Sequence, residues 1–199
     1  MTTDPLSEHS VFRAFLGEPR GAAVLDLGRT APELERWALD GGAAYTGLDL
    51  ADLERWSGVG LGSFDLVVSW MALHRVRNLA RLLETARHHT ARDGRLVLAV
   101  PHPVVTAAPH AAPNGTPNGA PGPAPDGAVR LSGYFDEGER TWDGAMIWHR
   151  TLEGYLYELR VCGFGLVELS EGRRMRGAPA GGAVPAPRQA LFRCRRATF

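Results

Sequence analysis

Short apolar runs alternate along this chain with segments whose apolar residues recur at helical spacing. The apolar runs predict buried strands over residues 24–27, 44–48, 64–69, 95–100, 164–169 and 190–194. The helical spacing predicts helices over residues 32–38, 79–86 and 152–159. Strands that alternate with helices are typical of a mostly parallel α/β sheet with right-handed crossovers. We expect the last two strands to pair antiparallel at one end of that sheet.

Residues that favour helix ends support these assignments. Thr30 and Glu33 have the spacing of a capping box, and Pro32 is tolerated in a first helical turn. Asn78 and Thr151 precede the other two helices and are good N-cap residues. The predicted helices therefore begin where the apolar periodicity begins.

Two segments lack either pattern because they consist largely of Ala, Pro and Gly. Residues 107–128 predict a flexible Pro/Gly-rich insertion, and residues 177–187 predict a flexible loop. Neither has enough large apolar residues to form a core of its own. We therefore expect residues 1–199 to form a single domain.

Charge and hydropathy exclude several classes of partner. Lys plus Arg and Asp plus Glu each number 22, so the formal net charge is zero. A neutral chain argues against a general nucleic-acid or membrane-surface binder. No apolar run approaches the ~20 residues of a membrane-spanning helix. The start, MTTDPLSEHS, lacks the charged and apolar regions of a signal peptide, which predicts a cytoplasmic location.

The cysteines and histidines do not suggest a metal site. Cys162 and Cys194 fit reduced structural thiols, and a disulfide between them is left open. No group of His, Cys, Asp or Glu has the spacing of a zinc site. We therefore predict no bound metal.

Several motifs together resemble one protein family. VLDLG at residues 24–28, GLDLA at 47–51 and DGRLVLAVPHP at 93–103 follow the order of its strand ends. The segment 62–83 is similar to its fourth strand and the helix after it, and segments from Ser132 and from His149 resemble its later part. These motifs resemble class I S-adenosylmethionine-dependent methyltransferases that act on small molecules. The resemblance implies a Rossmann-like fold with an antiparallel C-terminal strand.

The resemblance also implies a set of cofactor-binding residues. Asp26 and Gly28 correspond to the turn after the first strand, which holds the methionine part of S-adenosylmethionine. Asp49 corresponds to the acid that accepts hydrogen bonds from the ribose hydroxyls. Ser69, at the end of the predicted strand 64–69, is a further candidate cofactor-binding residue. Asp52 either contacts the adenine or simply caps the next turn.

Catalytic and substrate-binding candidates come from the segments that follow the strands. His74, His102 and His149 are candidates to position the methyl acceptor or to act as its general base. Each is also compatible with a purely structural role. Tyr134 and Trp142, together with Trp70, are the candidates to line a substrate pocket.

Two departures from the family pattern support an alternative function. The family's loop has three glycines, whereas Arg29-Thr30-Ala31-Pro32 follows Gly28 here, and residues with a Cβ resist positive φ. The span between Asp49 and Phe64 is too short for an ordinary helix and strand, which predicts that one edge strand is missing. The alternative is a methyltransferase-like protein without methyl transfer, serving as a partner subunit or with a pocket repurposed for rearrangement. A small molecule is the expected partner, and a protein partner or homo-oligomer is left open.

Overall fold

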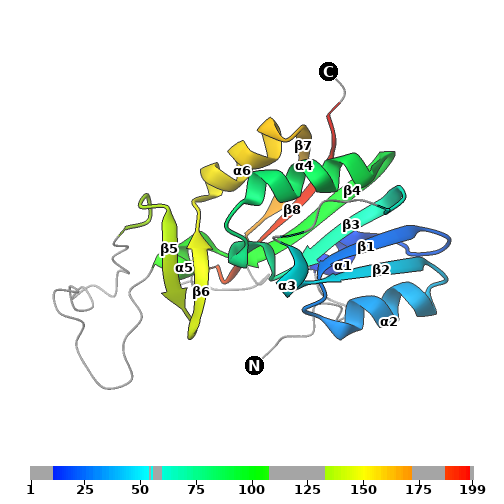
Figure 1. Ribbon diagram of the computed structural model, residues 1–199, viewed down its shortest axis with the longest axis horizontal. Helices are drawn as coiled ribbons and strands as arrows, with labels where there is room; N and C mark the ends of the chain where they lie inside the picture. Colours follow the sequence, from blue (N-terminus) through cyan, green and yellow to red (C-terminus); the bar gives the residue numbers. More distant parts are fainter. Residues whose placement is uncertain (1–10, 54, 56–59, 108–132, 172–186, 198–199) are drawn as a thin grey trace, which may run out of the picture.

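The six predicted strands form one twisted sheet in the order β2-β1-β3-β4-β8-β7 (Figure 1). The computed structural model describes residues 11–53, 55, 60–107, 133–171 and 187–197. The strands of the sheet are β1 (Ala23–Gly28), β2 (Ala44–Asp49), β3 (Phe64–Trp70), β4 (Thr90–Pro101), β7 (Phe164–Ser170) and β8 (Gln189–Arg196). Strands β1 to β4 pair in parallel, whereas β8 is antiparallel to both β4 and β7. The predicted fold class and the antiparallel pairing of the last two strands are confirmed.

The prediction of a missing edge strand is also confirmed within the described residues. Strand β2 lies at the edge of the sheet and pairs only with β1. Between β2 and β3 the described residues form one short helix, α3 (Leu50–Leu53). The connection is too short to cross the sheet and add another strand.

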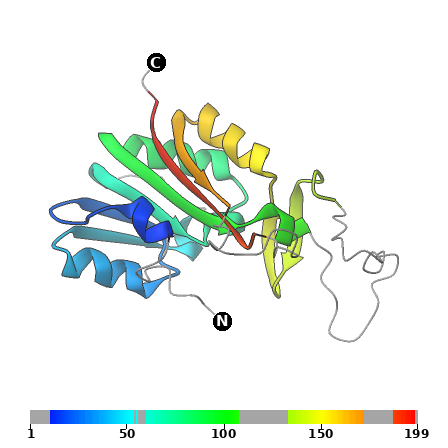
Figure 2. The ribbon, with the colours of Figure 1, turned by 180° about the vertical axis from the view of Figure 1, so that it is seen from behind.

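Helices cover both faces of the sheet. Helices α1 (Val11–Leu16) and α2 (Pro32–Asp40) lie on one face, and α4 (Leu79–His89) and α6 (Leu152–Val161) lie on the other (Figures 1 and 2). Side chains alternate between the faces along each strand. In β3, Val67 packs in the core beneath α4 and α6, whereas Leu66 and Val68 pack beneath α1 and α2. Apolar residues are therefore needed at consecutive strand positions.

A small lobe lies beyond the carboxyl ends of the parallel strands (Figure 1). It contains the 3-10 helix η1 (Leu73–Arg75), helix α5 (Pro103–Ala107) and the hairpin of β5 (Gly138–Trp142) and β6 (Ala145–His149). The hairpin was not predicted, although Asp143-Gly144 is a typical turn pair for a two-residue hairpin loop. Both turn residues have positive φ, 50° and 73°. Because β6 contacts η1 and α5, the hairpin is positioned against the exits of β3 and β4.

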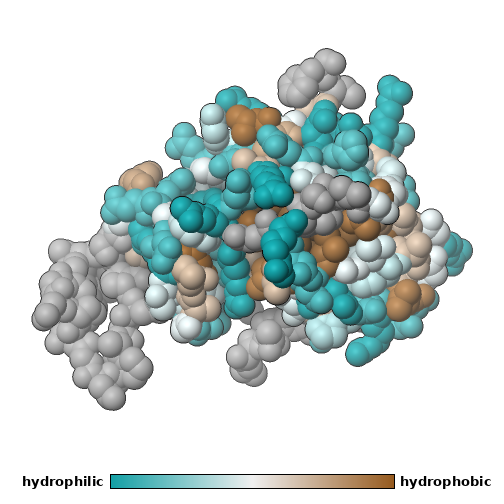
Figure 3. Space-filling view, viewed as in Figure 1, coloured by the Kyte–Doolittle hydropathy of each residue, from teal (hydrophilic) through white to brown (hydrophobic). Residues whose placement is uncertain are grey.

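The remaining sequence expectations concern segments and thiols. The predicted flexible segments 107–128 and 177–187 lie almost entirely outside the described residues. Cys162 and Cys194 are both buried and free, as expected for reduced thiols. Among the described residues, no helix is long and apolar enough to span a membrane. The face seen in Figure 3 is mostly polar, with hydrophobic side chains in separate patches.

Candidate functional site

The predicted cofactor residues converge at the carboxyl edge of the parallel strands. Gly28, the last residue of β1, pairs with Asp49, the last residue of β2. Asp26 lies two residues earlier on β1 and pairs with Val68 of β3. Ser69 is buried, and its hydroxyl donates to the Leu27 carbonyl at 2.7 Å. Ser69 therefore ties β3 to β1 rather than facing a ligand.

Asp26 is buried and only partly satisfied. Its Oδ2 accepts a hydrogen bond from the Tyr45 hydroxyl at 2.8 Å. Its Oδ1 is buried and has no hydrogen-bond partner among the described residues. Burial raises the pKa of Asp26 to about 6, although hydrogen bonds from the Tyr45 hydroxyl and the Arg29 backbone amide, and the Arg29 charge, oppose the shift. Sequence reasoning missed Tyr45, which only the pairing of β1 with β2 brings to Asp26.

The turn after β1 packs tightly against the exit of β3. Gly28 has a φ of 121°, and a Cβ at this position would lie 2.3 Å from the Cβ of Ala72. The Thr30 hydroxyl donates to the Trp70 carbonyl across the same contact. Glycine is therefore required at position 28, both for its backbone conformation and for the close approach.

Arg29 lies where the family pattern has a bare glycine-rich loop. Its φ is 46°, and its guanidinium pairs with Glu35 Oε2 at 3.0 Å and with Asp49 Oδ1 at 3.6 Å. Asp49 is largely exposed, with 63% of its side chain accessible. Asp52 is also exposed and pairs with Arg55 at 3.1 Å.

Of the three candidate histidines, His74 is the one without a hydrogen bond to any described residue. It is 3% exposed, and neither ring nitrogen has a partner among the described residues. The Trp142 ring meets it edge-on, with centroids 6.0 Å apart. Burial, together with the positive charges of Arg75 and Arg150, lowers the pKa of His74 to about 3. The imidazole is therefore neutral at physiological pH.

His102 is held by the protein itself. Its Nε2 lies 2.8 Å from Glu171 Oε1, and its Nδ1 accepts from the Val104 amide at 3.1 Å. Since Nδ1 is an acceptor, the ring proton lies on Nε2 and is directed at Glu171. This pair joins the exit of β4 to the end of β7, which is a structural role.

His149 is held in the same way. Its Nε2 donates to the Tyr134 carbonyl at 2.9 Å, and its Nδ1 lies 2.7 Å from Thr106 Oγ1. Burial lowers the pKa of His149. The ring connects β6 to α5 and to the segment before β5.

The three aromatic candidates lie in different places. Trp70 packs on Phe12 of α1, with ring centroids 4.6 Å apart, and belongs to the core beneath α1 and α2. Tyr134 lines a cavity of about 430 Å³ together with Val104, Phe135 and Asp136. Trp142 contacts His74 from the hairpin. Trp142 and Tyr134 therefore remain candidates for substrate contact, whereas Trp70 contributes to packing.

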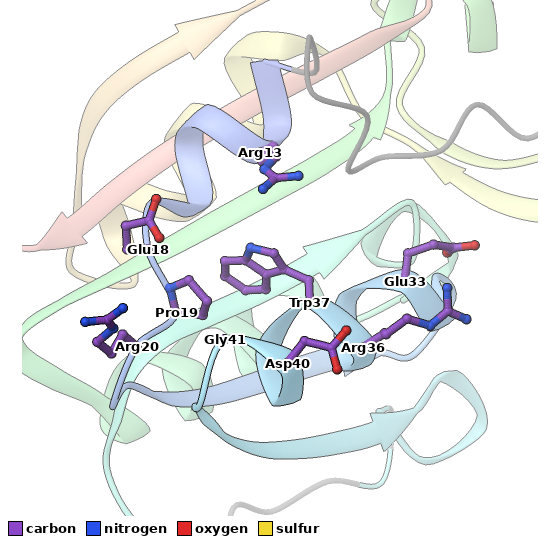
Figure 4. A pocket seen from close by; sticks show the side chains of 9 residues that line it. All are labelled: Arg13, Glu18, Pro19, Arg20, Glu33, Arg36, Trp37, Asp40 and Gly41. Carbon is purple, nitrogen blue, oxygen red and sulfur yellow. The ribbon is translucent and has the colours of Figure 1, made fainter.

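A second cavity, larger than the one at Tyr134, is a groove between α1, α2 and the segment that joins α1 to β1 (Figure 4). Its volume is about 520 Å³, and the Trp37 ring lies in its middle. Three arginines and three acids line it, namely Arg13, Arg20, Arg36, Glu18, Glu33 and Asp40. None of the predicted site residues lines this groove. Within the described part of the chain, no cluster of His, Cys, Asp and Glu could hold a metal ion.

Comparison with known proteins agrees with the resemblance read from the motifs. A model of the methyltransferase domain family matches residues 8–137. One similar structure is an S-adenosylmethionine-dependent methyltransferase from Mesorhizobium loti, with 24% identity, a TM-score of 0.70 and coverage of 93% of this chain and 95% of that one. No curated protein matches the chain.

Two further similar structures have ligands in their descriptions. The 1,6-didemethyltoxoflavin-N1-methyltransferase of Burkholderia thailandensis, with bound 1,6-didemethyltoxoflavin and S-adenosylhomocysteine, has 18% identity and a TM-score of 0.56, and the match covers 94% of this chain and 76% of that one. The glycopeptide N-methyltransferase MtfA, complexed with S-adenosylmethionine, has 14% identity and a TM-score of 0.56, and the match covers 97% and 91%.

At these identities the solved structures establish the fold, and the family model establishes the family because it matches more than half of the chain. The predicted Rossmann-like methyltransferase architecture is confirmed. The prediction of S-adenosylmethionine as the cofactor is confirmed at the level of the family. The chain therefore belongs to the methyltransferase domain family.

Proposed function

We propose that this chain binds S-adenosylmethionine at the carboxyl ends of β1 and β2 and transfers its methyl group to a small molecule held beneath the β5–β6 hairpin. The observation that carries the proposal is a pair of unsatisfied buried groups. Asp26 Oδ1 and both ring nitrogens of His74 lack partners among the described residues, on adjacent strands and their exits. A buried polar group without a partner costs about 1–3 kcal/mol. A ligand at this edge offsets that cost.

The residues present fit the cofactor. The free Oδ1 of Asp26 is an acceptor for the ammonium group of the methionine part, and the exposed carboxylate of Asp49 is an acceptor for two ribose hydroxyls. Gly28 lies between them at the end of β1, and its lack of a Cβ lets this turn approach Ala72 closely. When bound, S-adenosylmethionine supplies a methyl group on a positively charged sulfur, which makes the methyl carbon electrophilic.

His74 positions the acceptor rather than deprotonating it. A neutral imidazole offers one N–H donor and one acceptor nitrogen, so it orients a hydroxyl or an oxyanion. With a pKa of about 3 it is too weak a base to remove a proton from an aliphatic alcohol. The protein's contribution is therefore alignment of the nucleophile with the methyl group.

The charge around His74 favours an acceptor that ionises easily. Arg75 and Arg150 are the positive charges that disfavour a protonated His74. Arg150 is fixed by hydrogen bonds from Nη2 to the carbonyls of Val76 and Arg77, at 2.9 and 2.8 Å. The same positive field stabilises an anion, so a phenol or an enol is a better acceptor than an alcohol.

Two measurements test this proposal. We expect calorimetric titration to detect binding of S-adenosylhomocysteine, and Asp49→Ala to weaken it about tenfold or more because charge-assisted hydrogen bonds are lost. With S-adenosylmethionine present, we expect mass spectrometry to detect methylation of phenols and not of aliphatic alcohols. Absence of binding at millimolar concentration would contradict the proposal.

A specific observation favours the alternative of a methyltransferase-like protein without methyl transfer. Arg29 pairs with the ribose acid Asp49, and Pro32 supplies no amide donor at the start of α2. Binding of S-adenosylhomocysteine, together with no methylation of any phenol or enol offered as acceptor, would favour this alternative.

A further inference from the structure

Arg29 lies across the carboxyl ends of β1 and β2, and three features of the chain hold it there. Its φ of 46° is a left-handed conformation that non-glycine residues rarely adopt. Its side chain crosses β2 over Gly47, where an added Cβ would lie 2.4 Å from Arg29 Cδ. Its guanidinium ends between Glu35 and Asp49. Neighbouring residues are thus shaped to accept this side chain.

The two acids hold Arg29 unequally. Glu35, in the first turn of α2, is at hydrogen-bond distance of 3.0 Å, whereas the closest Asp49 contact is 3.6 Å. All three side chains are at least 40% accessible, so exchange between the partners costs little. Arg29 can therefore leave Asp49 while keeping Glu35.

We infer that Arg29 competes with the cofactor's ribose hydroxyls for Asp49, and that Glu35 holds the Arg29 guanidinium aside when the cofactor is bound. The inference rests on the proposed function, because it takes Asp49 as the ribose acid. Arg29 and Glu35 are positioning residues that act through Asp49, and their charges also reach Asp26, whose pKa Arg29 lowers and Glu35 raises. The two side chains set the cofactor affinity in opposite directions, which a merely structural role would not do.

The test is calorimetric titration of S-adenosylhomocysteine into the full chain and its variants. Arg29→Ala is expected to lower the dissociation constant about twofold to fivefold, the range of an exposed ion pair. Glu35→Gln is expected to raise it about twofold, because Arg29 then keeps Asp49 as its remaining acid. Glu35 acts on Asp49 through Arg29, and its own charge is the smallest of the five causes that shift the pKa of Asp26, so the double variant is expected to match Arg29→Ala closely.

Matched controls come from the same helix. Arg36→Ala and Glu33→Gln make the same charge changes on α2, but both residues line the groove between α1 and α2 (Figure 4). Neither control is expected to change the dissociation constant. If Arg29→Ala does not fold, Arg29→Gly takes its place, because glycine accepts the left-handed backbone.

The outcomes separate the inference from the proposed function. The inference is overturned, while the proposed function stands, if Arg29→Ala binds S-adenosylhomocysteine no more tightly than the wild type. It is also overturned if the double variant binds as weakly as Glu35→Gln alone. No binding by the wild type or any variant overturns the proposed function and the inference together. A lower dissociation constant for Arg29→Ala and a higher one for Glu35→Gln, with no change in the two controls, support both the proposed function and the inference.

Discussion

The two halves of the carboxyl edge are built differently. On the β1–β2 side, the acid Asp49 and its partner Arg29 are exposed and held by ion pairs. On the β3–β4 side, His74, His102 and His149 are buried, and the hairpin lobe covers the strand exits. Exposed ion pairs are weak and exchange readily, whereas buried polar groups are costly unless they are satisfied. Under the proposed function, the first side would allow exchange of the cofactor and the second would place the acceptor precisely.

The missing edge strand accounts for part of this difference. Strand β2 is the outermost strand on the cofactor side, and its residues are only partly buried. On the other side, β8 and β7 extend the sheet beyond β4. Substitutions that disrupt one half of the carboxyl edge and leave the other half intact test whether the two halves contribute independently to stability and binding.

The largest expected effect is at the point where the two sides meet. Gly28→Ala combines a φ of 121° with a Cβ 2.3 Å from Ala72. We expect urea denaturation to show a loss of about 3 kcal/mol in the free energy of unfolding. Gly42→Ala is the control, because Gly42 has a φ of 78° and open space around it, and should lose only about 1 kcal/mol. Equal losses would show that the contact with Ala72 contributes nothing.

The pH dependence of stability should separate Asp26 from His74. Folding raises the pKa of Asp26 from 3.8 to about 6, so between these values the folded chain holds the extra proton and stability falls as pH rises. Folding lowers the pKa of His74 from 6.5 to about 3, so there the unfolded chain holds the extra proton and stability rises with pH. Between about pH 4 and 6 the two slopes largely cancel.

Replacing Asp26 or His74 should leave the pH dependence of the unfolding free energy that the other residue causes. Relative to wild type, Asp26→Asn should make the unfolding free energy rise with pH by about 1.4 kcal/mol per unit. His74→Leu should make it fall by a similar amount. Urea denaturation at four pH values between 4.5 and 6 measures both slopes, with His88→Gln, an exposed site, as the control. Parallel slopes for the two variants would contradict the assignments.

A smaller effect is expected where the hairpin lobe is attached to α6. Glu137 Oε1 accepts hydrogen bonds from the Thr151 amide and hydroxyl, both at 2.7 Å. Glu137→Ala should cost about 1 kcal/mol and speed hydrogen exchange in β5 and β6 but not in β1. Glu139→Ala, an exposed change on β5, should alter neither. Equally faster exchange in β1 would mean that the lobe and the sheet open together.

The smallest effect is expected at Asp52, whose two predicted roles differ in outcome. Asp52 lies within α3, is exposed and pairs with Arg55, which favours a local surface contact over both capping and adenine contact. Asp52→Ala should change the affinity for S-adenosylhomocysteine by less than twofold and the unfolding free energy by no more than about 0.5 kcal/mol. A tenfold loss of affinity for S-adenosylhomocysteine would instead place Asp52 in the adenine site. The proposed cofactor site would then extend from the ends of β1 and β2 to α3.

Much of the fold could be predicted because its strands and helices follow from patterns of neighbouring residues. The six strands and three main helices follow from apolar periodicity and cap residues such as Asn78, whose side chain accepts from the Arg81 amide. Helix α1 was missed because its six residues are too short for a period to show. The hairpin was missed because its exposed, mixed sequence has little alternation, although Asp143-Gly144 was a usable signal.

The candidate cofactor residues came from the family resemblance, which assigned Asp26 and Asp49 through the motifs at 24–28 and 47–51. The structure places both residues toward the carboxyl ends of β1 and β2. The sequence could not rank His74, His102 and His149, since their difference lies in partners distant along the chain. His102 lies against Glu171 and His149 against Thr106, whereas His74 has the edge of the Trp142 ring beside it and no hydrogen bond among the residues that the structure describes.

The sequence by itself determined the order of strands and helices, the short connection after Asp49 and the presence of acids at the strand ends. These depend on period, length and residue type, which are local. Only the tertiary structure decided that Tyr45 satisfies one oxygen of Asp26, that Arg29 pairs with Asp49, and that His74 is buried with no hydrogen-bond partner in the described part of the chain. Burial and pairing are properties of the packed molecule, because they depend on which distant segments exclude water from a given atom.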